Sequence, residues 1–67
     1  SSFAILDLDK ESAMKTGEIE ADLKNKGEII DLEDIMIAAI ALQNNQILVT
    51  KNKKHFEKIQ GLAIQSY

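Results

Sequence analysis

Three polar residues in the second half of the chain have the types and spacing of a small site built from oxygen ligands. Asp34 stands at the head of an apolar stretch, and Thr50 and Asn52 end a β-branched run. A carboxylate or amide oxygen can bind a hard metal ion or orient a water molecule. Structural explanations exist for each: Asp31-x-x-Asp34 resembles a helix capping box, Thr is a common strand residue and Asn a common turn residue. By themselves the residue types leave both interpretations open, and for Asp34 they favour capping.

Alternating helices and strands are predicted to position these residues. Residues 47–50 (ILVT) are apolar without alternation, as expected for a buried parallel strand. The predicted elements, in chain order, are a strand at 3–8, a helix at 10–26, a helix from about 31 to about 44, a strand at 47–50, a short helix or turn at 53–59 and a strand at 62–64. The order β-α-α-β-α-β is typical of an α/β fold with parallel connections.

The first predicted helix has recognisable ends and a recognisable inner face. Asp9 is a plausible N-cap, and Gly27 stands where a glycine commonly ends a helix. We expect Gly17 to allow close approach to a sheet. The predicted inward stripe is Ala13, Thr16, Ile19 and Leu23. The predicted i,i+4 ion pairs are Glu11–Lys15, Glu20–Lys24 and Asp22–Lys26.

The second predicted helix is unusually apolar. Residues 35–42 are hydrophobic without a break. A helix that is hydrophobic all round is normally covered on several sides. We therefore expect this helix to be the centre of the core.

Composition limits the class of protein. Sixty-seven residues allow one small domain. The absence of cysteine excludes disulfides, and with His55 as the only histidine no four-ligand zinc pattern exists. No apolar run approaches the length of a membrane span and no signal sequence leads the chain, so we expect a soluble cytoplasmic protein. The chain opens on Ser1-Ser2 rather than Met, and we expect it to be a piece of a longer protein.

Charge is unevenly distributed along the chain. Residues 1–50 hold ten acidic residues and four lysines, whereas residues 51–67 hold four lysines and one glutamate, within a net charge of −3. No arginine is present, and the net charge does not indicate a nucleic-acid partner. A lysine run after a strand usually forms a solvated turn. If Asn52 borders a site, Lys51, Lys53 and Lys54 would lie at its rim.

The order of these motifs resembles the C-terminal half of the PIN-domain nucleases, and among them the VapC-type toxins. The resemblance is carried by D-x-x-I-A-A from Asp34, T-x-N from Thr50, an aromatic at Phe56, and I-x-G-L over 59–62. It implies a three-layer α/β/α domain with a parallel sheet. On this interpretation residues 1–67 form a partial PIN domain, without the N-terminal strand and early helices.

The resemblance also implies a function. VapC-like proteins are type II toxins that hydrolyse RNA with water activated by Mg²⁺ or Mn²⁺, form homodimers and are restrained by an antitoxin protein. Asp34 matches a metal-binding carboxylate of that family, and Asn52 matches a further site position where the family accepts Asn. Thr50, at the end of its strand, would face the same site as Asp34 and Asn52. Lys51, Lys53 and Lys54 would contact the RNA backbone. Since two further acids of the family lie outside this chain, we expect the chain alone to be inactive. His55 is expected to serve structure rather than catalysis.

Two other hypotheses remain. The chain could be a non-catalytic, PIN-derived interaction module that pairs through an open sheet edge, either with the N-terminal half of the same domain or with a second copy. It could also be an unrelated small α/β domain. The residues that fill the open sheet edge would discriminate between the ribonuclease hypothesis and the interaction module.

Overall fold

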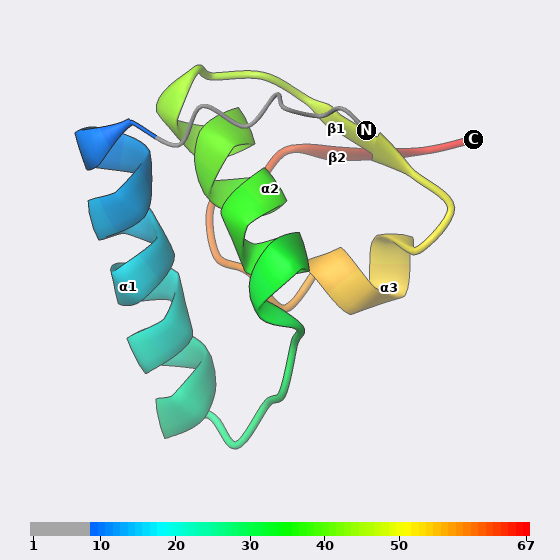
Figure 1. Ribbon diagram of the computed structural model, residues 1–67. Coiled ribbons are helices and arrows are strands. Elements are labelled where there is room, and N and C mark those ends of the chain that lie inside the picture. Colours follow the sequence, from blue (N-terminus) through cyan, green and yellow to red (C-terminus); the bar gives the residue numbers. More distant parts are fainter. Residues whose placement is uncertain (1–8) are drawn as a thin grey trace.

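The computed structural model describes residues 9–67. The predicted strand at 3–8 lies outside the described residues. The elements are helix α1 (Lys10–Asn25), helix α2 (Leu32–Gln43), strand β1 (Leu48–Thr50), helix α3 (Lys53–Phe56) and strand β2 (Ile64–Ser66). Their order confirms the predicted α-α-β-α-β succession within this range. Figure 1 shows α1 along one side of α2, with α3 and the two strands on the other side.

Helix α1 begins and ends where its local sequence predicts. The Asp9 side chain accepts a hydrogen bond of 2.8 Å from the Ser12 backbone N–H, which satisfies one of the unpaired donors of the first turn. At the other end the N–H groups of Gly27 and Glu28 donate to the carbonyls of Lys24 and Leu23. This double closure is a Schellman motif, and it requires the left-handed backbone that Gly27 adopts at φ +74°.

The buried stripe of α1 differs from the predicted one by one residue. Ser12 is buried and Ala13 is exposed, whereas Thr16, Ile19 and Leu23 are buried as predicted. The Thr16 hydroxyl donates to the Ser12 carbonyl at 2.8 Å, so its polar atom is satisfied on the buried face. The inner face is therefore rotated toward Ser12, and hydrogen bonding within the helix makes that polar stripe compatible with burial.

Two further expectations for α1 were wrong. Gly17 is exposed, and among residues 9–67 a Cβ placed there would meet no atom within 4 Å, so Gly17 allows no close approach to the sheet of the described residues. Helix α1 packs on α2 instead. Of the predicted ion pairs only Asp22–Lys26 forms, at 2.9 Å. Lys15 pairs with Glu18 at 3.1 Å instead of with Glu11.

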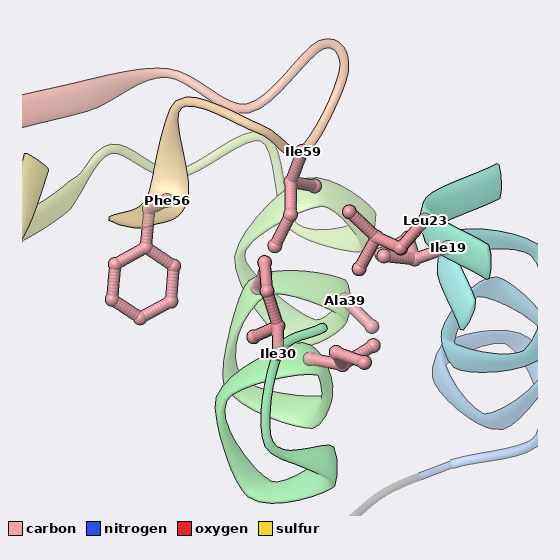
Figure 2. Close-up of a cluster of buried hydrophobic side chains, with 8 residues drawn as sticks. Ile19, Leu23, Ile30, Ala39, Phe56 and Ile59 are labelled. Carbon is pink, nitrogen blue, oxygen red and sulfur yellow. The ribbon is translucent and has the colours of Figure 1, made fainter. Parts of the chain in front are cut away.

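Helix α2 supplies the centre of the core. Ala38 and Ala39 are completely buried and Ile35 is 2% exposed. In Figure 2, Ile19 and Leu23 point from α1 toward α2, and Ile59 points toward Ile30. The core cluster consists of Ile19, Leu23, Ile30, Ile35, Ala38, Ala39, Phe56 and Ile59. Small alanines let neighbouring segments approach α2 closely.

The cover over α2 is less complete than its sequence predicts. Ile37 is 39% exposed and Leu32 is 52% exposed, so one side of the helix is open within residues 9–67. The uninterrupted apolar run therefore predicts the burial of Ile35, Ala38 and Ala39 correctly, but not the solvent contact of their neighbours.

The two strands of the described sheet are parallel. Leu48, Val49 and Thr50 pair in register with Ile64, Gln65 and Ser66. The second strand begins later than the predicted 62–64, and α3 ends earlier than the predicted 59. Gly61, at φ +84°, turns the chain between α3 and β2. The first hydrogen bond between the strands is donated by the Leu48 N–H to the Ala63 carbonyl. Within the described residues no helix is long and apolar enough to cross a membrane.

Candidate functional site

Asp34 occupies the first turn of α2, and its carboxylate is directed to another element. Its side chain is 34% exposed, and Oδ2 lies 3.0 Å from Nε2 of His55 in α3. Asp31 is the N-cap residue of α2, but its side chain forms no capping hydrogen bond. The capping box that Asp31-x-x-Asp34 resembles is therefore not formed by the Asp31 side chain. Asp34 contacts a residue 21 positions away in the chain.

His55 is held at this position by the short helix that contains it. The preceding carbonyl of Asn52 accepts from the backbone N–H groups of His55 and Phe56, at 3.0 and 3.2 Å. Phe56 is 6% exposed and anchors α3 in the core. The rings of His55 and Phe56 meet edge to face with centroids 5.1 Å apart. The position of the histidine is therefore fixed by its neighbours in α3 as well as by its contact with Asp34.

Thr50 and Asn52 connect the end of β1 to α3. The Thr50 Oγ1 accepts a hydrogen bond of 3.0 Å from the backbone N–H of Asn52. The Thr50 hydroxyl therefore holds residue 52 through its backbone N–H. Asn52 is the N-cap residue of α3, without a capping bond from its own side chain. Strand, turn and short helix form one hydrogen-bonded unit that ends at the Asp34–His55 contact.

The lysines after β1 divide into two groups. Lys51, Lys53 and Lys54 are exposed. Lys58 pairs with Glu28 at 3.0 Å, and its carbonyl accepts from the Lys26 ammonium at 3.0 Å. A shallow hollow lined by Lys54, His55, Glu57 and Lys58 borders the same helix. Lys51, Lys53 and Lys54 therefore lie close in sequence to His55, the partner of Asp34. Lys58 instead links the segment after α3 to the connection between α1 and α2.

The acidic chemistry of residues 9–67 does not by itself complete a metal centre. No group of three or more His, Cys, Asp and Glu side chains converges within this part of the chain. Asp34 has the right chemistry for one ligand of Mg²⁺ or Mn²⁺, because it is a partly exposed carboxylate. A magnesium ion requires near-octahedral oxygen coordination. The described residues therefore fit a contribution to such a site and not the whole of it.

The contact between Asp34 and His55 is not evident from the sequence. Each carries a plausible local role, and nothing in the spacing of 21 residues indicates that they meet. The available signal was indirect: His55 precedes a buried aromatic that must pack against the helix bearing Asp34. That packing places His55 beside Asp34 only once the path of the intervening strand β1 is known.

Comparison with known proteins assigns the chain to a family. The model of the PIN domain matches residues 1–62. The chain belongs to the PIN-domain family. Its α/β fold is correspondingly PIN-like. This PIN chain superimposes on a VapBC2 complex of Rickettsia felis bound to a promoter DNA fragment with a TM-score of 0.84 and 33% identity, covering 90% of this chain and 45% of that one. A DNA-bound VapBC complex of Salmonella typhimurium gives 0.85 and 39%, covering 91% and 46%.

Relatives of the PIN chain carry nuclease names. It is 37% identical over 67 residues to the tRNA(fMet)-specific endonuclease VapC of Salmonella typhimurium, covering 100% of this chain and 51% of the relative. It is 38% identical over 65 residues to the ribonuclease VapC1 of Methanocaldococcus jannaschii, covering 97% and 48%. A VapC ribonuclease of Pyrococcus furiosus is 34% identical over 64 residues, covering 96% and 43%. The chain thus spans about half the length of these relatives.

Proposed function

We propose that residues 1–67 are part of a PIN domain that hydrolyses RNA as a metal-dependent endoribonuclease of the VapC type. In this proposal Asp34 is one metal-binding carboxylate, and Asn52 and Thr50 lie at the edge of the same site. A bound Mg²⁺ or Mn²⁺ would supply an activated water and neutralise charge on the phosphate. An antitoxin protein as regulator, a cytoplasmic location and a homodimeric assembly belong to the same proposal.

The observation that carries the proposal is the placement of Asp34. A carboxylate in the first turn of a buried helix could have served as a cap, yet its Oδ2 lies 3.0 Å from His55 and not on a helix N–H. A carboxylate has two oxygens, and this contact uses one of them. His55 therefore holds the carboxylate in a defined orientation at the carboxyl side of β1, where α/β sheets commonly carry their sites.

The chain's own residues suit the handling of a phosphodiester as well. Thr50 and Asn52 keep the turn after β1 in one conformation through the Oγ1 hydrogen bond. That turn carries Lys51 and leads into Lys53 and Lys54, whose ammonium groups can contact RNA phosphates as point charges. Asn52 brings an amide oxygen without charge, so Asp34 provides the only carboxylate among the proposed site residues of this chain.

Metal binding by Asp34 can be tested on this chain directly. Mn²⁺ broadens the NMR signals of nuclei near the ion, so a titration followed by ¹⁵N-resolved spectra reports where the ion binds. We expect broadening to centre on Asp34 and to disappear in Asp34→Asn. Asp31→Asn is the matched control, because Asp31 precedes the same helix and should leave the broadening in place. Broadening that persists in Asp34→Asn would remove Asp34 from the metal site.

Catalysis requires a second experiment with the missing ligands supplied. The chain alone should leave RNA intact with Mn²⁺ present, because one carboxylate binds the ion weakly. Mixing the chain with the N-terminal half of the Salmonella relative should restore Mn²⁺-dependent cleavage, and Asp34→Asn should abolish it. Equal cleavage by the Asp34→Asn mixture would refute the proposed role of this residue.

A second candidate function is a binding module without catalysis. Within residues 9–67 the sheet has two strands, and Val49 in β1 and the preceding Ile47 are 53% and 59% exposed. Exposed apolar strand residues favour pairing with another segment. Analytical ultracentrifugation tests the pairing itself: Val49→Lys should abolish self-association through the sheet, whereas Asp34→Asn should leave it unchanged. The mixing experiment with the N-terminal half then separates a catalytic assembly from a non-catalytic one.

A further inference from the structure

The last residue of the chain lies next to the first lysine of the turn after β1. The parallel register ends with Thr50 opposite Ser66, so Lys51 and Tyr67 leave the sheet from the same edge. The Lys51 ammonium lies over the Tyr67 ring, 5.6 Å from its centroid. Figure 1 shows the C-terminus on the side of the molecule where β1 ends and the chain turns into α3.

This aromatic ring is unusually open to solvent. Tyr67 is 74% exposed, while Phe56 is 6% exposed in the core. The contact with Lys51 is a cation–π interaction at one face of the ring, and it leaves most of the ring exposed. An exposed, oriented ring can stack with a planar group, which a buried ring cannot do.

The electrostatic surroundings favour a polyanion at this edge. Lys51, Lys53 and Lys54 are exposed and follow one another within four positions, in a segment that holds one acidic residue, Glu57. The preceding fifty residues carry most of the acids. Proteins that bind single-stranded nucleic acid combine cationic groups that follow the backbone with aromatic rings that stack on bases. The Lys51–Tyr67 pair brings both groups together.

The position of the pair also relates it to the proposed site. Lys51 lies between Thr50 and Asn52, the two residues joined by the turn hydrogen bond, and the Asn52 carbonyl accepts from the His55 N–H. Lys51 is therefore four residues from His55, whose imidazole contacts the carboxylate of Asp34.

We propose that Tyr67 and Lys51 form a nucleobase-stacking platform for single-stranded RNA. The Tyr67 ring stacks on one unpaired base, and Lys51 contacts the adjoining phosphate. This inference rests on the proposed ribonuclease function, and it adds a substrate-binding residue that acts before the chemical step. Stacking on a phenol ring tolerates every base, so the platform contributes affinity and position rather than base preference.

The chain contains a built-in probe for this platform. Tyr67 is its only tyrosine and it has no tryptophan, so intrinsic fluorescence reports on this ring alone. We would titrate the chain with hexauridylate in EDTA, which prevents cleavage, and use N-acetyltyrosinamide to correct for absorption by the RNA. Saturable quenching of the tyrosine is expected, because a stacked base quenches the ring.

Variants separate stacking from charge. With fluorescein-labelled hexauridylate, anisotropy should give about a tenfold weaker Kd for Tyr67→Leu, whereas Tyr67→Phe retains the ring and should bind nearly as wild type. Lys51→Gln should reduce the slope of log K against log salt by about 0.7, the value for one phosphate contact on a single strand. Lys10→Gln, in the acidic part of the chain, is the charge control and should leave the slope unchanged.

The outcomes discriminate between the platform and the function on which it rests. Binding of RNA without tyrosine quenching, or unchanged affinity in Tyr67→Leu, would overturn the platform and leave the ribonuclease proposal standing. Equal affinity for an abasic hexamer would also overturn it, because phosphates alone would then account for binding. No binding by any form would refute the platform, while localisation of Mn²⁺ at Asp34 would still support a metal site.

Discussion

The contact between Asp34 and His55 should make a measurable contribution to the stability of the fold. The side chains meet at 3.0 Å and are 34% and 33% exposed. A hydrogen bond to a charged group contributes about 1.5–3 kcal/mol, and a solvent-exposed ion pair about 0.2–1 kcal/mol. Since two-thirds of each side chain is covered, we expect a coupling free energy of about 1 kcal/mol, between the two ranges.

A double-mutant cycle isolates this coupling from other effects of each substitution. The free energy of urea-induced unfolding, followed by circular dichroism, would be measured for wild type, Asp34→Ala, His55→Ala and the double variant. The Glu28–Lys58 pair is a matched control, with the same 3.0 Å separation and side chains 37% and 41% exposed. Its coupling should be smaller, about 0.3 kcal/mol, because two long flexible side chains lose more rotamer freedom than a ring fixed beside Phe56.

A coupling free energy near zero for Asp34–His55, or one no larger than that of Glu28–Lys58, would refute the predicted contribution of this contact to stability. Either result would mean that solvent screens the contact and that α3 is held against α2 by Phe56 and Ile59 alone. His55 would then have no part in orienting the Asp34 carboxylate.

Three further predictions concern the ends and interior of α1. Gly17→Ala should stabilise the chain by about 0.5–1 kcal/mol, since Gly17 is an exposed position inside a helix with no atom near an added Cβ. Gly27→Ala should destabilise it by about 1–2 kcal/mol, because the left-handed backbone at φ +74° penalises a Cβ; equal effects in urea unfolding would contradict the assignment of Gly27 as the helix terminator. The hydrogen bond from the Ser12 backbone N–H holds the pKa of Asp9 below its ordinary value of 3.8. The stabilisation by Asp9 is therefore complete above that value and is lost as pH falls through the lower folded pKa, so thermal midpoints measured from about pH 5 to about pH 2 should fall less steeply in Asp9→Asn. An identical pH profile for that variant, which keeps a capping oxygen but does not titrate, would show that other carboxylates dominate.

Features that depend on near neighbours in the chain were predictable from the residues. Asp9 caps α1 and Gly27 ends it, because each acts through hydrogen bonds within one turn of the same helix. Asn45 adopts φ 51° in the turn after α2, a left-handed backbone that Asn tolerates better than most residues. The family resemblance followed from short motifs whose order is itself a property of the sequence.

Other features were decided by packing. The rotation of α1 that buries Ser12 and exposes Ala13 depends on where α2 lies. The bounds of β2 depend on the register with β1, which the residues of β2 do not encode alone.

For the candidate site, the sequence by itself determined that Asp34 begins an apolar helix and that Thr50 and Asn52 follow a strand. The tertiary structure alone decided that Asp34 meets His55 and that Lys51 meets Tyr67. Both contacts join segments 16 or more residues apart, so they exist only after the parallel strands align and Phe56 enters the core. Sequence patterns report local preferences within a few residues, whereas contacts between distant segments depend on the folded path of the whole chain.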